Sequence, residues 1–327
     1  MALTLWLAAL APLAFLIVAL APERAAPILA TSRPAAVLSL SASLVGLAAA
    51  LLLGPASTPL AGVAGLGFSV RIEALSGVLA TLIGAIGLIV VAYSRNYLAG
   101  DPRQGVFVRT LCGALGLVQG LVLSGNLGQV VVCWIATSLC LGRLLLFRGE
   151  RQAAVLAARK RFLVSRLSDV CLAAAAILLW SSCGSGDIAT ILAAARHAAG
   201  PAWGAAAILL ALAAALSSAQ LPFHGWILEV METPTPVSAL LHAGVVNAGG
   251  FLILRFAGVV AASPEAMALL IVVGAATALF GSLVMLAQSS VKVGLAYSTI
   301  GQMGFMLLEC GLGAFPAALL HIVAHAL

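Results

Sequence analysis

Long apolar runs alternate with short polar segments along the chain, and this alternation predicts a series of membrane-spanning helices. About 20 apolar residues are needed to cross the hydrocarbon core of a bilayer. By this measure we expect spans at residues 3–21, 35–53, 74–93, 107–124, 127–147, 163–181, 203–231, 237–260, 265–287 and 293–312. A further apolar run begins at residue 315 and continues to Leu327. The pattern therefore predicts an all-α polytopic membrane protein with about 10–11 transmembrane helices.

The span at residues 203–231 is expected to be broken. Three prolines lie between residues 222 and 236, and proline breaks a helix because it has no N–H and clashes with the preceding turn. Inside a bilayer, the freed backbone groups must be satisfied by protein or by a water-filled cavity. Ionisable side chains beside such a break indicate an ion pathway. The candidates here are His224, Glu229, Glu232 and His242.

The composition excludes an ordinary soluble domain, because 63% of the residues are hydrophobic and only 8% are charged. The first apolar run has no basic segment in front of it, so we expect a retained span rather than a cleaved signal peptide. The six cysteines lie in or beside apolar segments without Cys-x-x-Cys spacing. This placement predicts buried side chains rather than disulfides or a zinc site.

The net charge of +6 carries information on membrane orientation, because most Lys and Arg residues fall in alternate loops. The most basic segment, residues 148–166, is expected to face the cytoplasm, which places residues 184–201 and the N-terminus outside. Within that segment, residues 148–162 are expected to form a short amphipathic helix on the inner membrane surface. A distribution of this kind does not indicate nucleic-acid binding.

Residues 221–243, LPFHGWILEVMETPTPVSALLHA, resemble the broken-helix signature of the antiporter-like membrane subunits. Such subunits occur in respiratory complex I, membrane-bound hydrogenases, Mrp-type cation/proton antiporters and DAB-type inorganic carbon pumps. Two stretches, HGWILEVMETPTPVSALLHAGVVNAGGFL and GQMGFMLLECGLGAF, resemble the DAB branch, whose membrane subunit is DabB, more than the complex I branch. The resemblance implies inverted five-helix repeats with a broken helix in each.

The same resemblance implies a division of the chain. Residues 1–105 are expected to form N-terminal transmembrane helices. Residues 106–261 are expected to form a first antiporter-like five-helix unit, with its break near residues 217–236. Residues 262–327 would begin a second unit that is truncated, since the last apolar run is short and has no polar flank. The alternative is that a partner completes this unit.

Two pairs of ionisable residues follow helical spacing. Arg166 and Asp169 match the family's Arg-x-x-Asp pattern and share a helix face. They would form either a structural ion pair or a point of proton entry. Glu229 and Glu232 are also three residues apart, and Glu232 matches the family's Met-Glu-x-Pro. These two could accept protons, or they could bond the free N–H groups at the start of the next helix.

Three histidines and one lysine complete the expected ion-translocation set. His242 matches the family's Ala-Leu-x-His-Ala, and an imidazole can relay protons because it titrates near neutral pH. The alternative is a hydrogen-bonded core histidine. Lys292 matches the family's Lys-x-x-Leu-Ala-Tyr-Ser-Thr segment. His321 and His325 share one helix face, and the resemblance implies a proton relay there rather than a metal site.

Two positions depart from the family pattern. Ile135 stands where the Trp-Glu segment of the family has Glu, and Ser217 stands where proton-pumping members bury a Lys. In those members the Glu and Lys act together as the switch of the first half-channel. Since Ile and Ser cannot do so, we do not expect the first unit to pump in the ordinary way. Arg143 and Glu309 are less usual ionisable residues within the spans.

The resemblance implies the membrane subunit of a DAB-type inorganic carbon (CO2/bicarbonate) pump in a bacterial inner membrane. This transporter subunit would conduct a cation, expected to be a proton, down its gradient. Its partner would be a large soluble DabA-like subunit with a zinc centre resembling that of a carbonic anhydrase, and this chain would hold no cofactor.

Two alternatives remain. The chain could be a proton- or sodium-translocating subunit of complex I, of a membrane hydrogenase or of an Mrp antiporter, and in the first two cases it would serve a redox-driven oxidoreductase. It could also be a non-conducting membrane anchor. Ile135 and Ser217 disfavour the first alternative. The buried ionisable groups disfavour the second, because each costs about 3 kcal/mol at the centre of a spanning helix.

Overall fold

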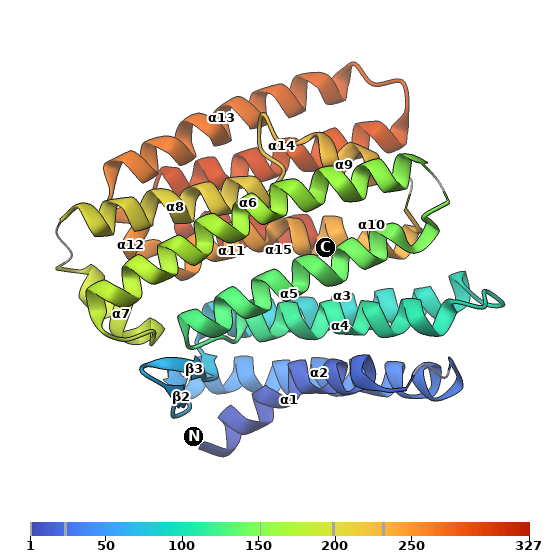
Figure 1. Ribbon diagram of the computed structural model, residues 1–327, viewed down its shortest axis with the longest axis horizontal. Helices are drawn as coiled ribbons and strands as arrows, with labels where there is room; N and C mark the ends of the chain where they lie inside the picture. Colours follow the sequence, from blue (N-terminus) through green and yellow to red (C-terminus); the bar gives the residue numbers. More distant parts are fainter. Residues whose placement is uncertain (1, 23–24, 151, 198–199, 231–232) are drawn as a thin grey trace. The chain divides into compact units, whose positions relative to one another are not determined.

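The apolar runs fold into helices because a backbone surrounded by hydrocarbon must pair its own N–H and C=O groups. The structure, a computed structural model, describes residues 2–22, 25–150, 152–197, 200–230 and 233–327 (Figure 1). Among these residues, 7 helices are long and apolar enough to cross a membrane by length and composition. Three shorter helices, Thr4–Leu20, Pro201–Ser217 and Phe315–Ala326, are also apolar. The expected polytopic all-α fold is confirmed.

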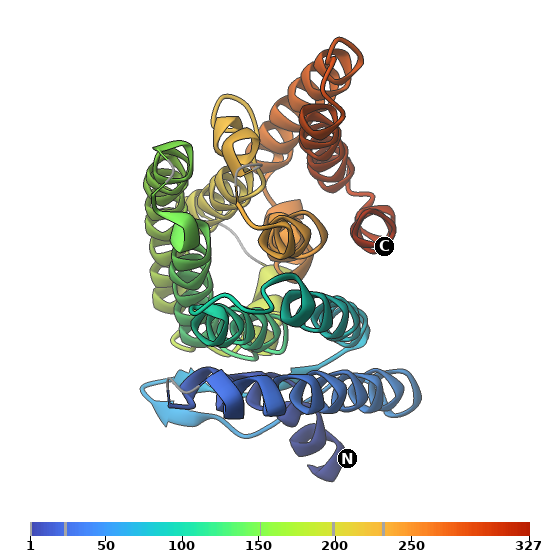
Figure 2. The ribbon, with the colours of Figure 1, turned by 90° about the vertical axis from the view of Figure 1, so that its right-hand side faces the viewer.

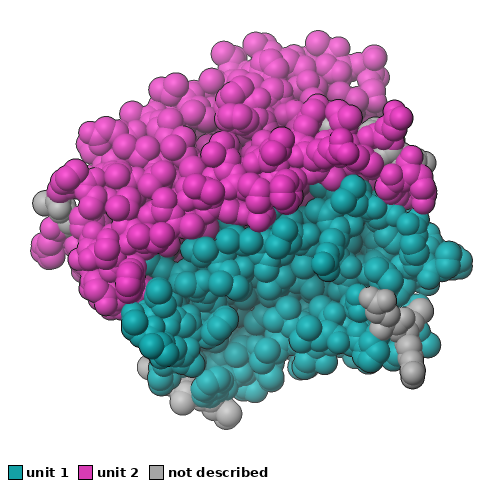
Figure 3. All heavy atoms as spheres, viewed as in Figure 1, with its two compact units in different colours: residues 1–147, 234–240 teal, residues 148–233, 241–327 magenta. Residues whose placement is uncertain are grey.

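The first of two compact units comprises residues 1–147 and 234–240 and is drawn in teal in Figure 3. In this unit α4 packs against α1, α2, α3 and α5. The helices are α1 (Ala2–Leu20), α2 (Ala25–Leu53), α3 (Ala74–Tyr97), α4 (Gln104–Val122) and α5 (Leu127–Leu145), followed by the 3-10 helix η1 (Leu146–Arg148).

Gln119 of α4 joins three helices inside the first unit. Its side chain is fully buried, and its Oε1 accepts a hydrogen bond from Ser39 Oγ of α2 at 2.8 Å. Its Nε2 donates to the carbonyl of Ala80 in α3 at 3.2 Å and to Ser43 Oγ at 3.3 Å. Satisfied polar side chains of this kind stabilise helix packing in membranes by about 1 kcal/mol each.

Short strands occupy the connection between α2 and α3. β1 (Ala56–Ser57) pairs antiparallel with β4 (Arg71–Ile72), and β2 (Ala61–Val63) pairs antiparallel with β3 (Leu66–Phe68). The hairpin between β2 and β3 turns at Ala64 and Gly65, which both have positive φ. These strands are too short for a period-two pattern to reveal, so the sequence indicated only a loop here.

The second unit comprises residues 148–233 and 241–327 and is drawn in magenta in Figure 3. α10 (Thr235–Ala243) is divided between the two units at residue 240. The other helices of the second unit are α6 (Gln152–Cys183), α7 (Ile188–Ala195), α8 (Pro201–Ser217), α9 (Gly225–Glu229), η3 (Val245–Asn247), α11 (Ala248–Arg255), α12 (Ala257–Ala261), α13 (Pro264–Leu286), α14 (Val291–Gly311) and α15 (Phe315–Ala326).

Glycines let α13 and α14 pack with their backbones in contact, and Figure 2 shows the two helices side by side. A Cβ added at Gly304 of α14 would collide with the backbone of Ala278 in α13. A Cβ at Gly274 or Gly281 of α13 would likewise collide with the backbone of α14. Small residues hold membrane helices together in this way because close approach maximises van der Waals contact where no hydrophobic driving force exists.

The structure corrects one expectation about the basic segment. Residues 148–162 do not form a separate surface helix, because α6 runs without interruption from Gln152 to Cys183. The apolar residues among 153–158 make this helix apolar enough to extend the sixth span, and Ala154 and Ala157 are fully buried. Arg and Lys side chains allow such an extension because their charged ends can reach the interface.

The expected broken helix is present. α8 ends at Ser217 and α9 begins at Gly225, so the break falls on residues 218–224. The following span is also interrupted, at Gly244 and at Phe256, which separate α10, α11 and α12. No sequence signal predicts this second interruption, because no proline lies between residues 237 and 263.

Candidate functional site

Protein groups satisfy much of the backbone at the broken helix. The amide N–H of Leu221 donates to Thr277 Oγ1 of α13 at 3.1 Å. Ser218 Oγ donates to the carbonyl of Val246 at 3.0 Å, and Gln220 Nε2 donates to the carbonyl of Ser218 at 2.9 Å. Thr277 of α13 and Gln220 within the break thus replace two of the intrahelical bonds that the break removes.

Arg166 and Asp169 form the ion pair expected from their spacing. Arg166 Nη2 lies 2.7 Å from Asp169 Oδ2, and the Asp169 side chain is only 8% exposed. Removal of Arg166 would leave the buried charge of Asp169 without a compensating charge. The geometry therefore explains why both residues occur together, while a role in proton entry stays a prediction.

Arg161 is a buried residue that the sequence analysis placed in a cytoplasmic loop. It is 7% exposed, and its Cζ lies 4.4 Å from the ring centroid of Trp226 in α9. The Asp169 carboxylate also attracts it electrostatically. Arg161 therefore links α6 to the broken-helix segment by a cation–π contact. Arg161 precedes Asp169 by about two helical turns, and this spacing was the sequence signal that could have placed both on one helix face.

Two carboxylates, Glu229 and Glu232, follow the break. Glu232 lies outside the described residues. Glu229 is the last residue of α9, and its side chain lies outside the described part of the structure. Their proposed role in ion translocation is therefore untested.

His224 contacts an aromatic side chain, and Lys292 lies near the start of α14. The His224 ring contacts Phe280 of α13, with 5.2 Å between ring centroids, and Phe280 in turn contacts Tyr297 of α14. Lys292 is exposed in the first turn of α14. Lys292 therefore lies about 10 Å of helix rise from Thr299 on the same helix.

Three histidines of the second unit lie within electrostatic range of one another. His242 Nδ1 is 2.9 Å from Thr299 Oγ1 of α14. His325 influences His242 electrostatically, and His321 influences His325, one turn earlier on α15. The structure therefore brings together His242, His321 and His325, three of the residues that the sequence analysis selected.

Thr299 determines how His242 can carry a proton. Its hydroxyl lies 3.2 Å from the carbonyl of Leu295 and can donate to it. In that arrangement the oxygen accepts from the Nδ1–H of His242, and His242 Nε2 becomes the proton acceptor. This Nε2 is buried without a hydrogen-bond partner among the described residues, and so is His325 Nε2. Buried nitrogens of this kind are suited to exchange a proton with a neighbour or with water.

His321, the histidine nearest the start of α15, contacts a carboxylate. Its Nδ1 lies 3.1 Å from Glu309 Oε1 of α14. Both side chains line a groove of about 570 Å³ in which Ser298, Gln302 and His325 supply further polar atoms. We call Thr299, His242, His325 and His321 the histidine line, and Glu309 lies next to it.

The two departures from the family pattern occupy ordinary packing positions. Ile135 is half-buried in α5. Ser217 Oγ donates to the carbonyl of Ala214 at 2.9 Å. A Cβ added at Gly249 of α11 would lie 2.8 Å from this hydroxyl oxygen, so the two helices pack closely here. Neither residue can change its charge. Arg143 is exposed in α5.

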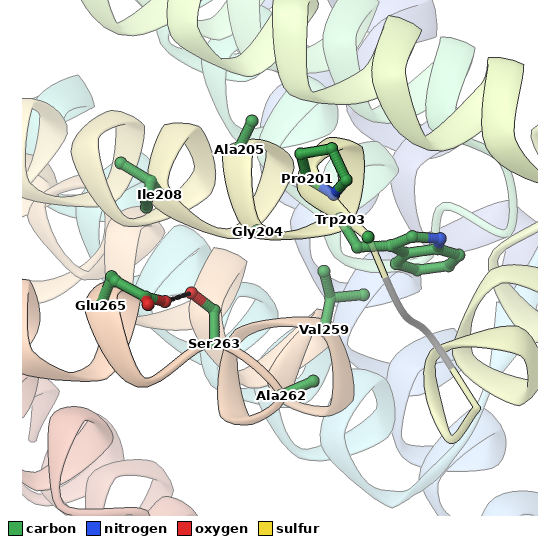
Figure 4. Close-up of a pocket in the computed structure, with 10 residues that line it drawn as sticks. Pro201, Trp203, Gly204, Ala205, Ile208, Val259, Ala262, Ser263 and Glu265 are labelled. Atoms are coloured by element: carbon green, nitrogen blue, oxygen red, sulfur yellow. Dashed lines mark hydrogen bonds between the residues drawn. The ribbon is translucent and has the colours of Figure 1, made fainter.

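A second cavity, of about 600 Å³, lies between α8, α12 and the start of α13 (Figure 4). Its one charged side chain is Glu265, whose Oε2 accepts a hydrogen bond from Ser263 Oγ at 2.9 Å. None of the expected site residues lines this cavity. Ser263 also caps α13, so this pair has a structural explanation.

A profile of the family described as "NADH:quinone oxidoreductase/Mrp antiporter, TM" matches residues 124–327. The chain belongs to this family. The antiporter-like resemblance of the broken-helix segment is therefore confirmed, and the chain is a multi-pass membrane protein. The match covers all of the histidine line, which lies between residues 242 and 325.

Curated relatives of the chain include proteins named as probable inorganic carbon transporter subunits. The chain is 46% identical, over 85% of its length, to "Probable inorganic carbon transporter subunit DabB2" of Halothiobacillus neapolitanus and covers 50% of that protein. It is 36% identical, over 78% of its length, to "NAD(P)H-quinone oxidoreductase chain 5" of a Synechocystis species and covers 38% of that protein. The chain thus spans about half the length, or less, of these curated relatives.

Two solved structures share the fold of this chain. The chain superposes on the Mrp complex from Dietzia sp. DQ12-45-1b with a TM-score of 0.83 and 29% identity, covering 99% of this chain and 35% of that one. An archaeal membrane-bound sulfane sulfur reductase gives a TM-score of 0.81 at 18% identity, covering 100% of this chain and 67% of that one. At that identity the second likeness shows the fold alone.

Proposed function

We propose that this chain is the membrane subunit of a DAB-type inorganic carbon pump and that it conducts a proton through the histidine line. The observation that carries the conduction step is the juxtaposition of His242, His325 and His321, with Thr299 orienting the first of them. The 46% identity to the DabB2 subunit supports the assignment to inorganic carbon transport.

The histidine line can move a proton by successive transfers between imidazoles. Each ring takes a proton at one nitrogen and releases another from the opposite nitrogen, so a histidine both accepts and donates. Measured along α14 from Thr299 to Glu309, the line and its adjacent carboxylate extend over about 15 Å of helix rise. That length is about half of an apolar core about 30 Å thick. It is therefore long enough to serve as a half-channel.

The coupling to carbon chemistry is assigned to a soluble partner. In this proposal the partner is a large DabA-like subunit whose zinc centre converts CO2 and water to bicarbonate and a proton. This chain supplies the path by which the proton gradient drives that reaction in one direction. The repeat boundaries at residues 106–261 and 262–327, and the inner-membrane location, are part of the same proposal.

We predict that His321→Ala combined with His325→Ala abolishes gradient-driven uptake, because the double change removes two successive carriers from the line. The measurement is uptake of inorganic carbon by a carbonic-anhydrase-deficient host that expresses the assembled transporter. His197→Ala is the matched control, since His197 follows the end of α7 and lines neither of the two cavities described above. Normal uptake at normal abundance of the double variant would contradict conduction through the histidine line.

A second candidate function is ion translocation for an oxidoreductase or an Mrp antiporter. The 36% identity to a quinone oxidoreductase chain 5 favours it, whereas the uncharged Ile135 and Ser217 disfavour it. The proteins that co-purify with the chain distinguish the two. A large zinc protein supports the carbon pump, and redox or antiporter subunits support the second candidate. Growth of the host in air with the partner alone would instead reduce this chain to an anchor.

A further inference from the structure

Glu309 is an ionisable residue of the second unit that does not belong to the expected ion-translocation set. It lies two residues before the end of α14, and its side chain is 29% exposed. Its Oε1 contacts His321 Nδ1 at 3.1 Å, while its Oε2 is buried without a hydrogen-bond partner in the described residues. A buried carboxylate oxygen without a partner is costly unless it binds a proton or water.

The groove beside Glu309 provides access for water. It measures about 570 Å³, which is ample room for several water molecules, and a water needs two to four polar partners to be held. On α14, Ser298, Gln302 and Glu309 lie four and seven residues apart and so share one face. α15 contributes His321 and His325 to the same groove. The groove therefore places polar groups beside His321 and His325.

Glu309 lies at the end of the histidine line that is nearest to the membrane surface. Glu309 lies about 3 Å of helix rise from the end of α14, and His321 lies about 9 Å from the start of α15 at Phe315. By the orientation that the basic loops predict, this end of both helices faces the outside. His325 and Thr299 follow at greater depth, so the ionisable groups run from the outer boundary towards the middle of the membrane.

We propose that Glu309 is the outer proton acceptor of the pathway, which takes a proton from water in the groove and passes it to His321. This inference rests on the proposed function. In the transfer, the O–H bond of the Glu309 carboxyl breaks and an N–H bond forms at His321 Nδ1. The products are a carboxylate and an imidazolium, which attract each other across 3.1 Å. Release of the other ring proton, from Nε2 towards His325, leaves His321 neutral, and groove water protonates Glu309 again.

The test measures proton flux through the assembled transporter in vesicles, with a pH-sensitive dye inside. Glu309→Gln should lower the flux at least about tenfold, because the amide cannot carry the proton. Glu309→Asp should retain a substantial part of it. Glu265→Gln is the matched control, since Glu265 belongs to the other cavity and loses the same charge. Combining Glu309→Gln with His321→Ala should lower the flux no further than the stronger single change, because the two groups act in series.

The outcomes separate this proposal from the proposed function. Normal flux in Glu309→Gln, beside wild-type flux that needs the histidine line, would overturn the role of Glu309 alone. A wild-type transporter without proton flux would overturn both. If Glu309→Gln does not assemble, the wild-type complex can be treated from outside with a water-soluble carbodiimide and an amine. Flux lost in proportion to modification of Glu309 supports the proposal, whereas modified Glu265 beside unmodified Glu309 would contradict it.

Discussion

At the scale of single residues, the second unit stabilises charged and polar groups by pairing them. Arg166 neutralises Asp169, Arg161 lies against Trp226, and His242 is hydrogen-bonded to Thr299. Such pairing is required because an isolated charge in an apolar environment is strongly destabilising. The atoms left without partners in the described residues include His242 Nε2, His325 Nε2 and Glu309 Oε2. Those three atoms belong to the histidine line and its neighbour, while other atoms of this kind, including Gln220 Oε1, lie elsewhere.

Arg161 gives a prediction at this scale. Arg161→Met keeps the long apolar stem but removes the cation, so the broken-helix segment should lose its attachment to α6. The expected cost is about 1–2 kcal/mol, the worth of a desolvated cation–π contact. It should appear as a lower midpoint of thermal unfolding of the purified complex. Arg159→Met is the control, because Arg159 is exposed on the same helix. Equal midpoints for the two variants would contradict the contact with Trp226.

At the scale of secondary-structure elements, small residues decide which helices pack closely. α13 and α14 meet through glycines on both sides, whereas Gly142 of α5 has open space around it. The difference arises because a Cβ in the first interface would occupy the volume of a neighbouring backbone, which cannot move without separating the helices. The close packing of α13 also brings Thr277 to the broken helix, where it accepts from Leu221 N–H.

We predict that Gly304→Leu separates α13 from α14 and lowers the yield of folded protein. An added Cβ alone already collides with the backbone of Ala278. Overpacking of this kind typically costs about 1–3 kcal/mol. The measurement is the monodisperse fraction of the detergent-purified protein on size exclusion. Gly142→Leu is the matched control, and a loss of similar size in both variants would show that the effect is not specific to this interface.

At the scale of the whole molecule, the alternation of basic loops predicts the orientation of the chain. The basic segment at residues 148–166 is expected to face the inside, and residues 184–201 the outside. The extension of α6 to Gln152 keeps the basic residues at one end of a single helix, which is consistent with this arrangement. The outer position of Glu309 depends on the same orientation.

Cysteine labelling tests the orientation. A membrane-impermeant thiol reagent applied from the periplasm should modify Ser185→Cys and spare Gln152→Cys, because only residue 185 is expected outside. The background should carry Cys140→Ser and Cys183→Ser, since these two native cysteines are the partly exposed ones. Labelling with the opposite pattern would reverse the orientation and would place Glu309 at the inner mouth.

Much of the fold could be predicted from the sequence. The apolar runs gave helix limits within a few residues for α3, α5, α13 and α14, because the length of an apolar run is set by the bilayer itself. The break after Ser217 followed from Pro222, which lacks the N–H that a helix needs. The strands β1 to β4 and the interruption at Gly244 were missed, since they depend on local hydrogen bonds and packing that leave no periodic signal.

The sequence by itself determined which residue types could carry charge through the membrane and which family the chain resembles. Only the tertiary structure decided which of them meet. His242 and Thr299 are 57 residues apart in the chain yet share a hydrogen bond, and Glu309 faces His321 across the turn between α14 and α15. The reason is physical: helical spacing predicts neighbours on one helix, whereas contacts between helices depend on how side-chain volumes pack. In the sequence Glu309 is an unusual acid with no evident partner, and only the folded chain shows that it contacts His321.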